Sequence, residues 1–366
     1  MRVLFLTNIP APYRVDFFNE LGKECDLTVL YERSKASDRD DRWISDKNKN
    51  FKSIFLKGKN IREDASLSLE VIKFLDKNKF DIFVIGGYST PTAMLAIQIL
   101  KLKKTPFILN VDGGFIKNDK KIAKRIKSYF IGSASWWLST GKLTDKYLVH
   151  YGAKKSNIFN YPFTSIRESE VLETNISKQE KFKLRKELNI DGENIAISVG
   201  QFIERKGYDL LIDAWSNIDD DWKLLIIGSG IDRDKLEELI KHNDIKNVEL
   251  LDFKPKNELR KYYEMADLFI LPTREDIWGL VVNEAVAYGL PIITTDRCIA
   301  GEELVSNKDN GFVLPIEEIS NINHYIELIS EDIDEFKENS LKVSKEYTIE
   351  KMAKKHIEIF RKIIAE

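Results

Sequence analysis

The segment from Leu268 to Thr295 constrains the fold of this chain more than any other. It begins as an apolar strand, breaks at Pro272 into a polar loop, continues as a mostly apolar helix from Leu280 to Tyr288 that Gly289 ends, and closes with a second apolar strand. Strand, helix and strand in this order form a βαβ unit, in which ligands bind beyond the carboxyl ends of the strands. The sequence therefore predicts an α/β fold with a ligand site at this loop.

The residues of the loop and the helix start indicate the chemistry of that ligand. Gly279 allows close approach to the backbone, and the first amides of the helix, from Gly279, Leu280 and Val281, favour an anion such as a diphosphate. Asp276 on the loop and Glu284 one turn into the helix are suited to accept hydrogen bonds from the diols of a sugar or ribose. The simpler alternative is an acidic helix start with one satisfied buried glutamate.

This segment resembles the acid-x7-Glu signature of the retaining glycosyltransferases of family 4. The family has the GT-B fold, an α/β fold of two facing Rossmann-like domains with a cleft between them. Counting back from Gly279 puts Asp276 at the first acidic position and Glu284 at the second. Glu275 precedes Asp276, and which of these two acids meets the sugar is left open. The resemblance implies that Ile277 and Trp278, on the same loop, also contact the donor.

A second motif follows the strand predicted from Ile195 to Val199. After Gly200 and Gln201 the chain reaches Arg205-Lys206-Gly207 and then a helix. This resembles another signature of the family, in which Gln201 stands where Arg is common. Two fixed cations there can neutralise a departing diphosphate, as a divalent metal does in other transferases, so we expect catalysis without a metal. A surface turn is the alternative.

The resemblance assigns roles to other strand ends. Phe253 and Lys254 follow the strand that ends at Leu251 and are expected to contact the nucleobase. Asp112 follows the strand from Phe107 to Val111 and precedes two glycines, so we expect it near the acceptor or the sugar, with a turn or helix cap as the alternative.

The first strand of the chain ends in a proline-rich loop. Pro10-Ala11-Pro12 stands where the family often has glycines, and a helix is predicted from Val15 to Leu21. We expect Tyr13 and Arg14 to lie on the acceptor side, although a rigid turn with a surface arginine fits as well.

Length and composition agree with an enzyme of two domains. At 366 residues the chain exceeds one ordinary core, and we predict an acceptor-side domain at 1–164, a nucleotide-sugar domain at 165–345 and a returning helix at 346–366. A net charge of -2 gives no bias toward nucleic acid. Two cysteines, Cys25 and Cys298, and the absence of an 18-residue apolar run favour a cytoplasmic protein.

The segment from Lys117 to Phe130 predicts a basic amphipathic helix. Ile122, Ile126 and Phe130 share one face, and the residues from Lys120 to Lys127 are mostly cationic. Such a helix suits binding to an anionic membrane surface, on the inner face of the membrane, where a lipid-linked acceptor would be located. An ordinary helix packed on the sheet is the alternative.

The resemblance implies transfer of a hexosyl group from a nucleoside diphosphate sugar, with UDP favoured, to a growing glycan. Three other functions are considered. A metal-dependent GT-A transferase would use Asp38 and Asp40, a dinucleotide oxidoreductase would need a fuller glycine motif than Gly228-Ser229-Gly230, and a non-catalytic relative would only bind the nucleotide sugar. The four histidines are too scattered to predict a metal site.

Overall fold

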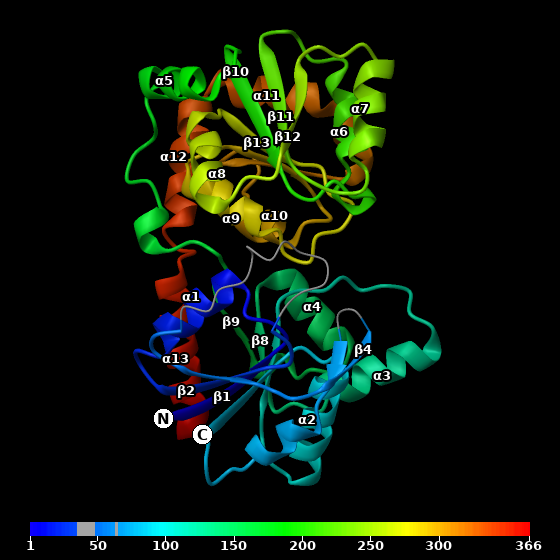
Figure 1. The fold of residues 1–366 in the computed structure, drawn as a ribbon, viewed down its shortest axis with the longest axis vertical. Coiled ribbons are helices and arrows are strands. Elements are labelled where there is room, and N and C mark those ends of the chain that lie inside the picture. Colours follow the sequence, from blue (N-terminus) through cyan, green and yellow to red (C-terminus); the bar gives the residue numbers. More distant parts are fainter. Residues whose placement is uncertain (35–47, 63–64) are drawn as a thin grey trace. The chain divides into compact units, whose positions relative to one another are not determined.

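The computed structural model describes residues 1–34, 48–62 and 65–366, which form two compact units. The first unit contains Met1–Ser165 and Thr348–Glu366, and the second contains Ile166–Tyr347. Each unit is built on one parallel sheet with helices packed against it (Figure 1). Asp38 and Asp40, the candidates for a metal-dependent transferase, lie outside the described residues.

The first domain has a seven-stranded sheet in the order β3-β2-β1-β6-β7-β8-β9. Its strands are β1 Arg2–Thr7, β2 Asp26–Tyr31, β3 Lys52–Phe55, β6 Ile82–Gly86, β7 Ile108–Val111, β8 Trp136–Ser139 and β9 Ile158–Asn160. Its α-helices are α1 Pro12–Leu21, α2 Pro91–Leu102, α3 Lys121–Ile131, α4 Lys142–His150 and α13 Ile349–Ala365. The remaining elements are the antiparallel pair β4 Lys59–Arg62 and β5 Ala65–Leu67, and the 3-10 helices η2 Leu69–Phe74 and η3 Lys155–Asn157.

The second domain has a six-stranded sheet in the order β12-β11-β10-β13-β14-β15. Its strands are β10 Asn194–Val199, β11 Trp222–Gly228, β12 Val248–Asp252, β13 Leu268–Leu271, β14 Ile292–Thr295 and β15 Gly311–Leu314. Its α-helices are α5 Lys178–Leu188, α6 Tyr208–Trp215, α7 Arg233–His242, α8 Lys256–Met265, α9 Leu280–Ala287, α10 Ile299–Leu304, α11 Ile322–Glu331 and α12 Ile333–Ser344. Its 3-10 helices are η4 Glu168–Glu170, η5 Glu204–Lys206 and η6 Ile316–Asn321.

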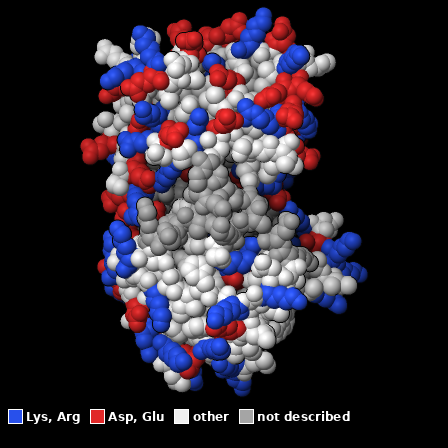
Figure 2. Space-filling view, in the orientation of Figure 1, with Lys and Arg blue, Asp and Glu red and all other residues white. Residues whose placement is uncertain are grey.

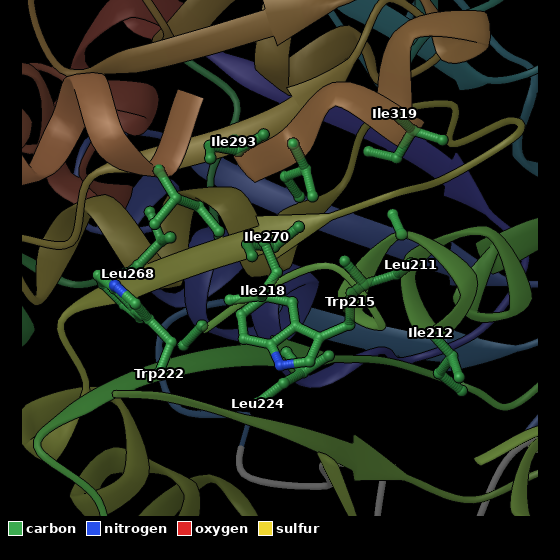
Figure 3. Close-up of a cluster of buried hydrophobic side chains, with 14 of the residues drawn as sticks. Leu211, Ile212, Trp215, Ile218, Trp222, Leu224, Leu268, Ile270, Ile293 and Ile319 are labelled. Carbon is green, nitrogen blue, oxygen red and sulfur yellow. The ribbon is translucent and has the colours of Figure 1, made fainter. Parts of the chain in front are cut away.

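Apolar side chains from helices and strands fill the core of the second domain. Trp215 on α6 lies fully buried near Ile270 on β13, and residues of β11 and η6 complete the cluster (Figure 3). Parallel strands buried on both sides are expected to be apolar throughout, as β13 is. This core fixes the positions of β10 and β13, and so of the loops that follow them.

The strand order of the second sheet reverses between β10 and β13. These strands are parallel neighbours, with Ala196 opposite Leu268 and Ile197 opposite Phe269. In open α/β sheets this reversal point is where the loops diverge and ligands bind. The loops after β10 and β13 are the two that carry the predicted donor residues.

The helix predicted to begin at Val15 begins at Pro12 instead. Proline is well suited to the first helical position, because its fixed φ is helical and its missing N–H would have no intrahelical partner. Tyr13 and Arg14 therefore lie on α1 and not in the preceding loop. The basic helix is also shorter at its start than predicted, because α3 begins at Lys121.

Helix α13 belongs to the first domain although it follows the second in the chain. It packs against α1, and in Figure 1 the red α13 lies beside the blue α1. His356 of α13 is fully buried between Phe17 and Tyr161, with ring centroids 4.7 and 4.5 Å away. Burial lowers the pKa of His356 to about 4, so the ring is a neutral packing residue at pH 7.

Candidate active site

The loops after β10 and β13 are joined by a set of direct contacts. The backbone N–H of Arg274 donates to the carbonyl of Arg205 at 2.9 Å, and the Thr273 hydroxyl donates to the same carbonyl at 3.0 Å. The Arg205 guanidinium in turn donates to the carbonyl of Glu275 at 2.6 Å. The two motifs that are 70 residues apart in the chain thus form one surface within the second domain.

A charged cluster lies on this surface. Lys206 donates through Nζ to Oδ2 of Asp276, and Nη1 of Arg205 lies 3.9 Å from Oδ1 of the same carboxylate. Lys206 is only 8% exposed, whereas the Arg205 side chain is far more open to solvent. A buried ammonium next to an accessible guanidinium and a carboxylate can hold a charged, hydroxyl-rich ligand.

Two glycines allow the backbone of this site to take its shape. Gly207 has a φ of 70°, and a Cβ there would lie 2.1 Å from the carbonyl oxygen of Pro272. Gly279 has a φ of 100°, and a Cβ there would lie 2.6 Å from Sγ of Cys298. Positive φ favours glycine, so both positions require it for the close approach of these segments.

An ion pair outside the cluster holds the loop after β13 in place. Arg274 donates to both carboxylate oxygens of Asp209 on α6, at 2.7 and 2.8 Å. Burial alone would raise the pKa of Asp209, but the hydrogen bonds and charge of Arg274 outweigh it and lower that pKa. The loop is therefore anchored by a bidentate charged pair at neutral pH.

Glu284 lies on α9, at the second position of the predicted signature. The phenol of Tyr263 on α8 donates to its Oε2 at 2.9 Å. Tyr263 was not predicted as a site residue, because no local pattern in the sequence links α8 to α9. Burial and the charge of Glu284 raise the pKa of Tyr263 well above its usual value, so the phenol stays a donor at pH 7.

The remaining predicted donor residues differ in their surroundings. Ile277 is exposed at the loop tip, but Trp278 is buried and donates through Nε1 to Oδ1 of Asn283 at 2.6 Å. The Trp278 side chain thus supports the loop from inside the domain. Gly200 follows β10, Leu280 and Val281 begin α9, and Phe253 and Lys254 follow β12 at the same edge of the sheet.

Arg14 and Asp112 belong to the first domain and form an ion pair there. Arg14 is buried on α1, whereas the Asp112 side chain after β7 is 35% exposed. Burial would lower the pKa of Arg14, but the charge and hydrogen bond of Asp112, together with smaller contributions from Tyr13 and Tyr161, outweigh burial and raise that pKa. The structure thus brings together two of the predicted acceptor-side residues, and Tyr13 adds its ring 5.5 Å from the Arg14 guanidinium carbon.

Two residues that the sequence did not single out complete the environment of Asp112. Asn110 donates through Nδ2 to Oδ1 of Asp112 at 2.8 Å, and the Tyr161 phenol donates to the same oxygen at 3.2 Å. Tyr161 follows β9, 49 residues away in the chain. Only the sheet order brings these strand ends together, so no local pattern could have predicted the contact.

In the described part of the chain, no group of three or more His, Cys, Asp and Glu side chains is arranged to hold a metal ion. None of the helices in residues 1–34, 48–62 and 65–366 combines the length and apolar character needed to cross a bilayer.

Comparison with known families identifies the domain that carries the charged cluster. Residues 180–347 match the family described as glycosyl transferases group 1. These residues are similar in sequence to group 1 glycosyltransferases over the part of the chain that carries the cluster. This part of the chain contains Lys206, Asp276 and Glu284 together with all the elements that position them.

The chain is similar to an uncharacterized glycosyltransferase of Haemophilus influenzae, 30% identical over 195 residues, which cover 48% of this chain and 55% of the relative. The O-antigen biosynthesis glycosyltransferase WclY of Escherichia coli is 26% identical over 60% of this chain and 62% of its own length. The chain thus spans somewhat more than half of each of these relatives. Both relatives are named glycosyltransferases.

Solved structures extend the likeness beyond residues 180–347. HepE of Anabaena, solved with UDP-glucose, aligns with a TM-score of 0.75 at 15% identity, covering 100% of both chains. At this identity the likeness concerns the fold. It confirms the prediction of a GT-B fold with two Rossmann-like domains, whereas membership of family 4 stays a prediction.

Proposed function

We propose that the protein is a retaining glycosyltransferase of family 4. It transfers a hexosyl group from a nucleoside diphosphate sugar, with UDP favoured, to a hydroxyl of a growing cell-surface glycan. The observation that carries the proposal is the cluster of Arg205, Lys206 and Asp276 at the strand-order reversal of the second domain, within the residues that match group 1 glycosyltransferases. The names of WclY and of HepE with UDP-glucose support the glycan acceptor and the UDP donor.

Each residue of the cluster has a proposed role toward the donor. Lys206 and Arg205 stabilise the diphosphate as it departs, because fixed cations aimed at developing negative charge lower the barrier most. The amides from Gly279 to Val281 bind the same group at the start of α9. Asp276 accepts hydrogen bonds from sugar hydroxyls, and Glu284, oriented by Tyr263, accepts them from the ribose diol.

Retention of configuration follows if the acceptor attacks the face from which the diphosphate leaves. The departing phosphate oxygen then takes the acceptor proton, and no protein side chain is needed as the base. The two cations would supply the charge that a divalent metal supplies elsewhere, so we propose that no metal is required. Asp112, Tyr13 and Arg14 of the first domain are proposed to contact the acceptor.

The proposed acceptor is a lipid-linked glycan, which the protein meets as a peripheral protein on the inner face of the membrane. The basic segment from Lys120 to Lys127 supports this placement, because cations next to apolar side chains suit an anionic surface.

The donor is tested by measuring thermal unfolding with a panel of UDP, GDP and ADP sugars. A ligand at about 100 times its Kd adds roughly 2.7 kcal/mol to the free energy of unfolding. The stabilising donor is then offered to candidate acceptors with and without a chelator. Activity that the chelator abolishes would favour a metal-dependent enzyme, and binding without turnover would favour a non-catalytic protein.

The role of the cluster is tested with Lys206→Ala, which should lower kcat by about two orders of magnitude. Lys206→Met keeps the buried aliphatic chain and separates loss of charge from loss of folding. Lys261→Ala, an exposed lysine on α8, is the matched control. Full activity in both Lys206 variants would refute the proposed role.

A further inference from the structure

Positive charge is concentrated in one part of the first domain. Residues 101–155 contain 13 Lys and Arg against 3 Asp and Glu, a net charge of +10, although the whole chain has a net charge of -2. In Figure 2, blue side chains gather where α3 lies in Figure 1. The basic residues in or next to α3 are Lys117, Lys120, Lys121, Lys124, Arg125 and Lys127.

The first two turns of α3 are exposed around their whole circumference. Every residue from Lys120 to Ile126 is exposed, including Ile122 at 73% and Ile126 at 46%. Ile116, just before the helix, is 50% exposed. Helices in folded proteins are stabilised mainly by packing an apolar face, yet on this face Ile122 is mostly exposed and Ile126 is close to half exposed.

The opposite side of α3 holds the helix to the domain. Ile131 is the buried residue of α3, and Lys127 pairs with Asp119 at 2.8 Å. Nine residues separate Ile122 from Ile131, which at about 100° per residue turns the two side chains to opposite sides of the helix. Ile122 and Ile126 therefore point away from the side of the helix on which Ile131 is buried.

We propose that Ile116, Ile122 and Ile126 insert into an anionic lipid bilayer, while the neighbouring lysines and Arg125 contact lipid phosphates. Apolar side chains flanked by cations fit the boundary between acyl chains and anionic headgroups. A nucleic acid would use the cations but would leave the isoleucines in water. This surface is named the α3 face, defined by Ile116, Lys121, Ile122, Lys124, Arg125 and Ile126.

The α3 face lies close to the proposed acceptor site along the chain. Asp112 precedes Ile116 by four residues, which span at most about 14 Å when fully extended. A carboxylate this near the bilayer could reach the first sugars of a lipid-linked glycan. This part of the inference rests on the proposed function, whereas binding to the bilayer does not.

The test is sedimentation of the full chain with vesicles of phosphatidylcholine alone or mixed equally with phosphatidylglycerol. Binding is expected with the anionic vesicles only. Lys124→Gln with Arg125→Gln should weaken it about 25-fold, since each cation near an anionic surface contributes about fivefold. Ile122→Ser with Ile126→Ser should weaken it at least about tenfold, because apolar surface is no longer buried.

Matched controls lie elsewhere on the chain. Lys154→Gln with Lys155→Gln removes two exposed charges from the same domain, and Ile231→Ser removes an exposed isoleucine from the second. Both should bind nearly as tightly as the unaltered protein. No binding to anionic vesicles would overturn the proposal, as would equal loss in the controls.

A short RNA or DNA duplex is included as a competitor. If it binds as tightly as the vesicles and the serine variants bind both without loss, the α3 face is a nucleic-acid surface and the proposal is wrong. Vesicle binding requires neither donor nor turnover, so its failure would leave the proposal of sugar transfer untouched.

Discussion

Tyr263 donates a hydrogen bond of 2.9 Å from its phenol to Oε2 of Glu284. The tyrosine is 2% exposed and is held by stacking on Tyr288, with ring centroids 5.3 Å apart and ring planes 7° from parallel. A side chain fixed in this way limits the rotamers of its partner. Glu284 is therefore oriented before any donor arrives, which lowers the entropy that binding must overcome.

Loss of this hydrogen bond should affect donor binding more than turnover. Tyr263→Phe is expected to raise the KM for the nucleotide sugar about tenfold and to change kcat less than twofold, because a bond to a charged group contributes about 1.5–3 kcal/mol. Initial rates over a range of donor concentrations measure both constants. Tyr262→Phe is the control, and an unchanged KM in Tyr263→Phe would show that Glu284 does not need this partner.

The contact between Gly279 and Cys298 predicts a steric effect on stability. Gly279→Ala should lower the free energy of unfolding by about 2–4 kcal/mol. The loss is expected because alanine is strained at this positive φ and because its Cβ would overlap with Sγ of Cys298. Gly87→Ala is the matched control, because Gly87 has a φ of 98° but nothing within 4 Å of its Cβ position. Calorimetry should show a smaller loss in Gly87→Ala, and equal losses would mean that Cys298 accommodates the methyl group.

Much of the second domain could be predicted from the sequence, because its signals are local. Pro272 and Gly289 mark the ends of β13 and α9, and the apolar run that precedes each of them gives the element correctly. Contacts between distant segments could not be predicted. The charge pattern of α5 indicates a solvated helix, yet Lys181 and Arg185 are buried because Asp267, more than 80 residues later, pairs with both.

The same reasoning explains what was missed at the site. Position in the chain identified Asp112 as a strand-end carboxylate, but its partners Tyr161 and Arg14 depend on the order of strands in the sheet. Trp278 lies in the predicted loop. The orientation of its indole depends on Asn283, whose side-chain oxygen accepts a hydrogen bond from the indole N–H.

The ion pair between Arg14 and Asp112 predicts coupled effects on stability. Asp112→Asn should lower the free energy of unfolding by about 2–3 kcal/mol, because it leaves the buried Arg14 charge without its counterion. Adding Arg14→Met should restore part of that loss. Denaturant unfolding of both single variants and the double variant gives the coupling energy, and strictly additive losses would contradict a direct interaction.

Glu32 predicts a pH dependence of stability. Burial raises the pKa of Glu32 from 4.5 to about 7, outweighing the hydrogen bond of 2.6 Å from the Thr90 hydroxyl. Between pH 4.5 and about 7, the Glu32 carboxyl is therefore protonated in the folded state and ionised in the unfolded state. The contribution of Glu32 is therefore fully present below pH 4.5 and is lost as the pH rises through 7, with a total on the order of 3 kcal/mol.

Glu32→Gln should remove this dependence and stabilise the protein at pH 8 relative to the unaltered chain. Thermal unfolding at pH 5 and pH 8 measures this change in stability with pH. A substitution of an exposed glutamate, Glu24→Gln, is the control. A variant that loses the same stability between these pH values as the unaltered chain would show that another group titrates.

Helix α13 closes the first domain only after the whole of the second domain has been made. While the ribosome adds residues 166–347, α1 has already been made and the apolar side of Phe17 lies uncovered, since His356 and Phe360 do not yet exist. At about 5–20 residues per second this interval lasts on the order of 10–40 s. The first domain therefore stays incompletely folded during this interval. Chaperones or early packing of other segments would determine how much of it reaches the folded state.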